Sequence, residues 1–158
     1  MKIIKMLKLI AAIAICQTAG IIGAVFTTSS IPNWYATLQK PFFNPPNWIF
    51  GPVWITLYTM MGIAAFLVFE SKRDRKEVNT AIYYFLAQLI LNSIWSIIFF
   101  GLRLPLLAFA EIVLLWVAIT ATMIKFQKIS RPAFYLLIPY ILWVSFAAVL
   151  NLSLAILN

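Results

Sequence analysis

Five long apolar stretches follow one another along the chain, and polar connectors separate them. They cover residues 7–27, 48–69, 78–101, 104–124 and 133–157. Each is close to the 20 or so residues that an α-helix needs to cross about 30 Å of hydrocarbon. All connectors but one are short, so the chain has no room for a soluble domain. The pattern predicts an all-α membrane protein, with residues 1–158 forming one five-transmembrane-helix bundle.

The composition supports this fold class. Hydrophobic residues make up 64% of the chain and charged residues 10%, whereas soluble domains carry about 25% charged residues. Three lysines lie before or at the start of the first apolar stretch, as in a signal peptide, but the stretch is longer than a usual signal-peptide core. We therefore expect it to remain as the first helix of the bundle.

The basic residues predict an orientation. Ten of the twelve Lys and Arg residues lie before or at the very start of the first stretch, between the second and third, or between the fourth and fifth. With five spans these segments share one side of the membrane, and only Lys40 and Arg103 fall on the other. The positive-inside rule then places the N-terminus in the cytoplasm, which suits a bacterial inner membrane. The net charge of +8 thus reflects topology and attraction to anionic lipid, and no basic soluble module is present to bind nucleic acid.

Three of the expected helices carry polar and aromatic residues along one face. Since polar side chains in a membrane usually point into the bundle, these stripes should converge. Large indole rings in the stripes favour an aromatic-walled cavity for a small molecule. Helix–helix contacts through small residues and amide hydrogen bonds are the alternative interpretation. The stripes contain Gly51, Trp54, Tyr58, Met61 and Gly62; Tyr84, Gln88, Asn92, Trp95 and Phe99; and Tyr140, Trp143, Ala147 and Asn151.

The long connector, residues 28–47, is rich in aromatic residues and prolines. Proline has no backbone N–H and a fixed φ, so Pro41, Pro45 and Pro46 predict a stiff, extended segment. Such a segment could cover the cavity at the outer face as a lid. The alternative is an interfacial aromatic belt, which is common in membrane proteins.

Glu111 is the only acidic residue inside an expected span. Such residues are candidates for a functional site. A structural role on a packing face with Ala108, Leu115 and Ala118 is the alternative, and this small-residue face would also suit a homodimer contact.

The chain lacks the residues of conventional catalysis. It has no His and a single Cys, which removes the commonest general base and the commonest haem ligand and makes a metal cage implausible. We expect no metal, no required cofactor and no conventional catalytic residues.

Several motifs resemble those of one family. Trp-Tyr-x-x-Leu-x-Lys-Pro begins at Trp34, and Pro-Pro-x-Trp-x-Phe-x-Pro-Val-Trp-x-x-Leu-Tyr begins at Pro45. Leu-Asn-x-x-Trp-Ser-x-x-Phe-Phe-Gly-Leu-Arg begins at Leu91, and Pro-Tyr-x-x-Trp-x-x-Phe-Ala-x-x-Leu-Asn begins at Pro139. This set resembles the TspO/MBR family, which comprises the tryptophan-rich sensory proteins of bacteria and the mitochondrial translocator protein, or peripheral-type benzodiazepine receptor.

The resemblance implies a membrane receptor or sensor for porphyrins or haem-related tetrapyrroles and for benzodiazepine- or isoquinoline-type drugs. A transporter of tetrapyrroles and a light-dependent porphyrin-degrading enzyme are the alternatives, the latter with Trp54 and Trp143 as sites of photo-oxidation. A tetrapyrrole here would be recognised by stacking rather than by iron ligation through His. The ligand residues that the resemblance implies are Tyr35, Pro45, Trp54, Tyr58, Asn92, Trp95, Phe99, Trp143 and Ala147.

Two further expectations concern charged residues. Lys40 and Arg103 would clamp the propionate groups of a porphyrin at the cavity mouth, whereas Arg103 closing a short turn is the alternative. The cholesterol motif of mitochondrial members has a Tyr and an Arg after the Leu-Asn pair, but here Leu150 and Asn151 are followed by neither. Sterol recognition at this site is therefore not expected.

Overall fold

The computed structural model describes residues 2–158 and consists of helices joined by short connectors. The elements are α1 (Lys2–Ser30), η1 (Ile31–Tyr35), η2 (Asn47–Ile49), α2 (Phe50–Phe69), α3 (Arg75–Ser96), η3 (Ile97–Gly101), α4 (Pro105–Ile129) and α5 (Arg131–Leu157). Five helical segments are long and apolar enough to cross a membrane, and no strand occurs between residues 2 and 158. The predicted five-helix membrane bundle is confirmed.

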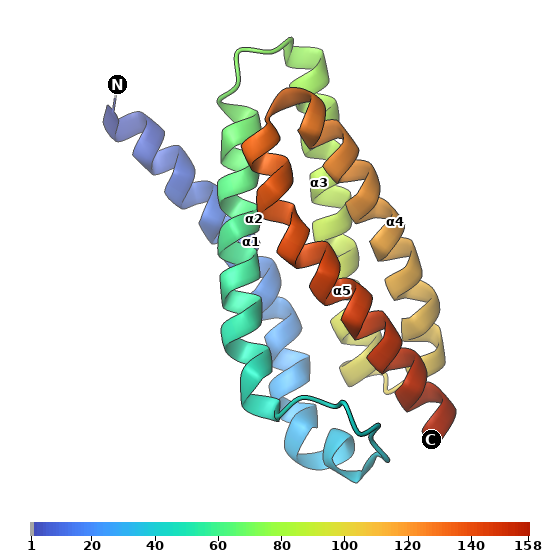
Figure 1. Ribbon diagram of the computed structural model, residues 1–158. Helices are drawn as coiled ribbons and strands as arrows, with labels where there is room; N and C mark the ends of the chain where they lie inside the picture. Colours follow the sequence, from blue (N-terminus) through green and yellow to red (C-terminus); the bar gives the residue numbers. More distant parts are fainter. Residues whose placement is uncertain (1) are drawn as a thin grey trace.

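The helices form a ring rather than a layered stack. α1 packs against α2 and α3, α2 against α5, α5 against α4, and α4 against α3, so the order around the ring is α1–α2–α5–α4–α3 (Figure 1). The N-terminal part of α1 leans away from the other helices, and the two chain termini lie at opposite ends of the bundle (Figure 1). Side chains from four helices can therefore converge inside the ring.

α1 changes neighbours along its length. Close to its middle it touches the backbone of α2, since a Cβ added to Gly62 would lie 2.5 Å from the Cα atom of Ile13. Nearer its C-terminal end it contacts α3, since a Cβ on Gly23 would lie 2.9 Å from Oγ of Ser96. α1 therefore leaves α2 as it approaches α3.

The helix ends follow local sequence signals. Asp74 caps α3 by accepting a hydrogen bond from the backbone N–H of Lys76, and Ser130 accepts one from the N–H of Ala133 at the start of α5. Prolines stand near the first positions of α4 and α5, where a missing N–H costs nothing. Arg103 has a positive φ of 58°, so it forms the tight turn between η3 and α4.

The long connector differs from the expected lid over residues 28–47. α1 runs to Ser30, and a π-helical turn, η1, continues through Pro32 to Tyr35. Helical backbone satisfies its own hydrogen bonds, which favours continued helix over an extended chain at the membrane boundary. Only residues 38–46, with Pro41 and Pro45, have the irregular structure that the prolines predict.

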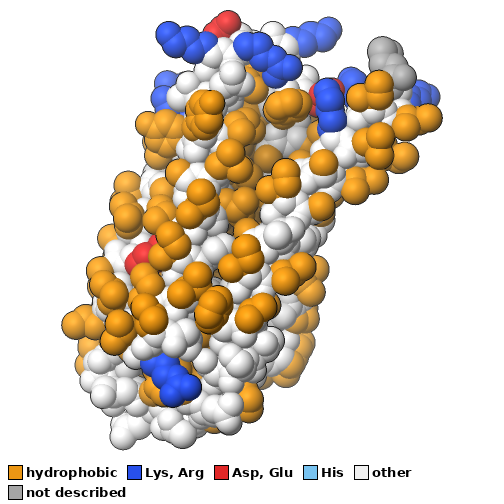
Figure 2. Space-filling model, turned by 180° about the vertical axis from the view of Figure 1, so that it is seen from behind, with side chains coloured by type: hydrophobic (Ala, Val, Ile, Leu, Met, Phe, Trp, Pro, Cys, Tyr) orange, Lys and Arg blue, Asp and Glu red, His pale blue; other side chains and the backbone are white. Residues whose placement is uncertain are grey.

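Basic side chains gather at one end of the bundle (Figure 2). At that end Lys8 on α1 donates a hydrogen bond of 2.7 Å to Glu70, just after α2, and Lys5 lies 3.8 Å from the same carboxylate. The hydrogen bond from Lys8, helped by the charges of Lys8, Lys5 and Arg75, holds the pKa of Glu70 below its ordinary value. These contacts tie the leaning end of α1 to α2.

Candidate functional site

A cavity of about 480 Å³ lies inside the ring between α1, α2, α3 and α5. Its volume falls within the range of small-molecule sites. No residue of α4 lines it. The predicted ligand residues along its wall are Tyr35, Trp54, Tyr58, Trp95, Phe99, Trp143 and Ala147. Seven of the nine residues that the family motifs imply are therefore brought together around one space.

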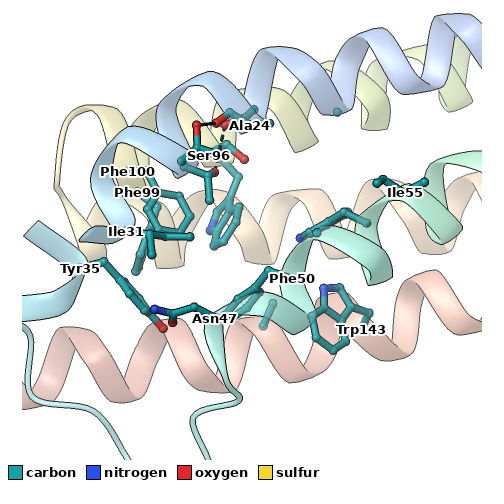
Figure 3. Close-up of a pocket in the computed structure, with 18 of the residues that line it drawn as sticks. Ala24, Ile31, Tyr35, Asn47, Phe50, Ile55, Ser96, Phe99, Phe100 and Trp143 are labelled. Atoms are coloured by element: carbon teal, nitrogen blue, oxygen red, sulfur yellow. Dashed lines mark hydrogen bonds between the residues drawn. The ribbon is translucent and has the colours of Figure 1, made fainter. Parts of the chain in front are cut away.

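Aromatic rings make up much of the wall, and most of them contact one another. Trp95 stacks on Phe99 at a centroid distance of 5.4 Å, and Trp54 stacks on Tyr58 at the same distance. Trp143 meets Phe50 edge to face at 6.1 Å. Figure 3 shows Phe50 and Trp143 on one side of the space, across from Ile31 and Phe99. These flat walls suit a flat, apolar ligand.

Two of the wall residues use their polar atoms inside the protein. Nε1 of Trp95 donates to Oδ1 of Asn151 at 3.0 Å, and Nδ2 of Asn151 donates to the carbonyl of Pro105 at 2.7 Å. The hydroxyl of Tyr35 donates to Oδ1 of Asn44 at 2.6 Å. The cavity therefore presents mainly ring faces rather than free hydrogen-bonding groups.

The polar stripe of α3 forms a buried hydrogen-bond chain below the cavity. The Tyr58 hydroxyl donates to Oδ1 of Asn92, Nδ2 of Asn92 donates to the Tyr140 hydroxyl at 2.9 Å, and that hydroxyl donates to Oε1 of Gln88 at 2.7 Å. Asn92 itself does not line the cavity. Its expected contact with a ligand is replaced by contacts with two tyrosines, one of which, Tyr58, does line the wall.

The cavity opens sideways, between α1 and α2, and not only toward the connector. Its exposed lining residues all lie on α1, η2 or α2. Ile21 and Ile55 are 63% and 61% exposed, and Trp48 in η2, just before α2, is 73% exposed. Gln17 marks one end of this opening, since its Nε2 atom donates to the carbonyl of Ile55 and to the hydroxyl of Thr59, both at 3.0 Å. The opening faces the surface that lipid would cover.

The remaining expected residues lie away from the wall. Pro45 lies in the irregular connector. Nζ of Lys40 donates to the carbonyls of Ala36 and Leu38, both at 3.3 Å, and lies 5.0 Å from the ring centre of Tyr35. Arg103 occupies its turn and is exposed. Lys40 therefore stands beside Tyr35, a residue of the cavity wall.

Three further features singled out in the sequence are Glu111, the packing face around it, and Tyr84. Glu111 is buried on α4, which takes no part in the cavity, and neither carboxylate oxygen has a hydrogen-bond partner among residues 2–158. Ala108 and Leu115 are buried within the bundle, which agrees with the packing role for this face, and Ala118 is partly exposed. A homodimer contact through this face stays a prediction. On α3, Tyr84 is 43% exposed rather than directed inward.

Sequence reasoning missed the contribution of α1. Apart from Gln17, its cavity residues are small or apolar and include Gly20, Gly23, Ala24 and Thr27. A Cβ on Gly20 would lie 2.5 Å from the ring of Tyr58, so the glycine lets that ring lie against α1. The spacing of small residues along α1 was the available signal, but such spacing also marks simple helix packing. Among residues 2–158 no group of His, Cys, Asp and Glu side chains could hold a metal ion.

Comparison with known proteins assigns the family. The TspO/MBR family model matches residues 12–157. The chain belongs to the TspO/MBR family. It is 44% identical to the tryptophan-rich protein TspO of Chlorobaculum tepidum over 154 residues, which cover 98% of each chain. It is also 38% identical to the human translocator protein over 133 residues, covering 82% of this chain and 78% of the relative. The membership that the motifs predicted is confirmed, and the protein is a multi-pass membrane protein of this family.

Proposed function

We propose that the protein is a receptor or sensor that binds a flat, largely apolar ligand in the cavity between α1, α2, α3 and α5. Tetrapyrroles such as porphyrins are the leading ligand class, and benzodiazepine- or isoquinoline-type drugs would occupy the same space. The family supports a ligand-binding membrane protein, and its relatives include a tryptophan-rich sensory protein and translocator proteins.

The observation that carries this proposal is the convergence of three indoles on one apolar cavity. Trp54, Trp95 and Trp143 come from three different helices and line the same space. Ring faces recognise a flat conjugated molecule by stacking, with edge contacts around it. Since Trp95 donates its N–H to Asn151, its ring is also held in a fixed orientation.

The ligand would reach this cavity from the bilayer. The exposed wall residues on α1 and α2 surround the side opening, and apolar molecules concentrate in the hydrocarbon phase. Binding from lipid into a preformed pocket needs no channel for water and no chain of titratable groups. Between residues 2 and 158, Glu111 is the only carboxylate away from the ends of the spanning helices, and it lies outside the cavity. This arrangement favours a binding protein over a proton-coupled pump.

Titration of the purified protein with protoporphyrin in the dark tests the proposal, with intrinsic Trp fluorescence as the signal. Trp54→Ala and Trp143→Ala should each weaken binding by about 1–3 kcal/mol, the range measured for stacking of nucleobases on aromatic rings. Trp116→Ala is the matched control, because Trp116 on α4 does not line the cavity. Unchanged affinity in both cavity variants would show that these indoles only pack helices.

The same samples separate the receptor from the enzyme and the transporter. Under illumination, loss of porphyrin absorbance that slows in Trp54→Phe and Trp143→Phe would indicate photo-oxidative turnover. Loss of absorbance at the same rate in the two variants as in the unmodified protein would indicate ordinary photosensitisation. Uptake of porphyrin into liposomes that depends on the protein would indicate transport.

A further inference from the structure

A second hollow lies at the basic end of the bundle, and it shares no lining residue with the aromatic cavity. Its volume is about 280 Å³, and it lies between the beginning of α3 and the end of α4. The lining residues are Lys76, Glu77, Thr80, Lys125, Lys128 and Ile129. None of them lines the aromatic cavity, so the proposed function does not account for this hollow.

The three lysines of the hollow are free to bind an anion. None of them forms a salt bridge with a carboxylate or donates a side-chain hydrogen bond within residues 2–158; the salt bridges there join Lys5 and Lys8 to Glu70. Glu77 lies in the same hollow but pairs with none of the three lysines. Three positive charges and one negative charge leave the hollow with a net positive charge.

The position of the hollow matches the headgroup level of a bilayer. Nζ of Lys125 lies 5.5 Å from the ring centre of Tyr84, and a partly exposed tyrosine beside a lysine is typical of the membrane interface. Below it, α3 and α4 expose apolar side chains such as Ile90, Val117 and Ile124. A charged group could therefore occupy the hollow while attached acyl chains lie along these helices.

We propose that this hollow binds the phosphate of an anionic phospholipid, with Lys76, Lys125 and Lys128 as its ligands. Basic pockets between transmembrane helices are known to take acidic headgroups. The acyl chains distinguish a lipid from a soluble phosphate, because only the lipid also gains contacts with the exposed faces of α3 and α4. This site is independent of the aromatic cavity and of its ligand.

Lipid selectivity measured by native mass spectrometry tests the proposal. The protein is titrated with phosphatidylglycerol and with phosphatidylcholine of the same chain length. Each lysine near a membrane surface contributes about a fivefold gain in affinity for anionic lipid. The triple variant Lys76→Gln, Lys125→Gln, Lys128→Gln should therefore lose at least about tenfold of the preference for phosphatidylglycerol. Removing the negative charge with Glu77→Gln should increase that preference.

A charge-matched control separates the hollow from the basic surface as a whole. Lys72→Gln, Arg73→Gln and Arg131→Gln remove the same charge from the same end but outside the hollow, so this variant should keep most of the preference. Equal losses in the two triple variants would overturn the site and leave a diffuse basic surface. Displacement of phosphatidylglycerol by millimolar inorganic phosphate would overturn the lipid assignment in favour of a soluble anion.

Discussion

At the scale of single residues, Asn92 joins three helices. Its amide accepts from Tyr58 on α2 and donates to Tyr140 on α5, and Tyr140 donates in turn to Gln88 on α3. All four side chains are buried. In a medium without water, each of these bonds replaces an otherwise unpaired polar group. These hydrogen bonds therefore fix the floor of the cavity, and the ring of Tyr58 forms part of its wall.

Replacing Asn92 by Leu should destabilise the protein more than it changes ligand selectivity. The variant leaves the Tyr58 hydroxyl without its acceptor and the Tyr140 hydroxyl without a donor, and a buried polar group without a partner costs about 1–3 kcal/mol. Thermal unfolding in detergent would measure the loss. Because Asn92 does not line the cavity, ligands with and without carbonyl groups should weaken alike.

A double-mutant cycle with Tyr58→Phe checks the cause. Since both substitutions break the same hydrogen bond, their effects should not add. Additive effects would contradict a shared bond. A selective loss for carbonyl ligands would instead place the Asn92 amide in contact with the ligand.

The residue pattern could predict which side chains face the interior but not which partner each would take. Trp54, Trp95 and Trp143 were expected at a cavity and line one. Asn92 and Glu111 both stood out in the sequence as polar residues inside the spans. In the structure Asn92 is hydrogen-bonded to two tyrosines, whereas Glu111 is buried on α4 away from the cavity. Hydrogen-bond partners depend on helix rotation and depth to within a few ångströms, which a period of 3.6 residues does not provide.

At the scale of helices, α1 determines the shape of the cavity opening. It touches α2 at Gly62, is tied to it by Gln17, and then leans onto α3 at Gly23. Gly62 and Gly51 lie on the same helix but in opposite surroundings. A Cβ at Gly62 would meet the α1 backbone at 2.5 Å, whereas one at Gly51 would meet nothing within 4 Å.

Ala substitution at these two glycines should have opposite effects. Gly62→Ala forces the α1 and α2 backbones apart and should destabilise the fold by about 1–3 kcal/mol, the cost typical of overpacking. Gly51→Ala adds no clash and replaces a poor helix former, so its stability should be unchanged or higher by up to about 1 kcal/mol. Thermal unfolding of the two variants side by side gives the comparison. Equal stability in both would contradict the close α1–α2 contact.

A bulky residue at Gly51 should slow ligand exchange. The site lines the cavity, is exposed and has open space around it, so Gly51→Phe places a ring in the side opening without disturbing the core. Association and dissociation should both slow, with a smaller change in affinity, as measured by stopped-flow Trp fluorescence. Val113→Phe on the exposed face of α4 is the control. Unchanged rates would show that the ligand takes another route.

The helix pattern also shows where sequence reasoning reached its limit. Residues 28–35 were expected in an irregular lid because the connector is rich in aromatic residues and prolines. In the structure residues 28–35 are helical and continue α1 through η1. The C-terminal half of α1 diverges from α2 toward α3, and this divergence leaves the opening. It depends on contacts with two other helices and has no local signal in the sequence.

At the scale of the whole molecule, the distribution of basic residues fits a bundle with an odd number of spans. The basic connectors meet at one end of the bundle (Figure 2), and the termini lie at opposite ends (Figure 1). Hydropathy could predict the spans and the charge asymmetry could predict which connectors share a side, because both depend on the membrane rather than on packing. The ring order of the helices needed the structure, since short connectors alone allow several arrangements.

The orientation itself is the last prediction, and it follows from the asymmetry of ten basic residues against two. If the basic end faces the cytoplasm, Phe42 in the connector, which is fully exposed, lies outside, and Lys72 between α2 and α3 lies inside. In a Cys16→Ala background, which removes the one native thiol, a membrane-impermeant maleimide should label the Phe42→Cys variant in intact cells. The Lys72→Cys variant should react only after permeabilisation. The Cys16→Ala parent measures background labelling, and the reverse pattern in the two variants would place the N-terminus outside and move the proposed phospholipid site to the other leaflet.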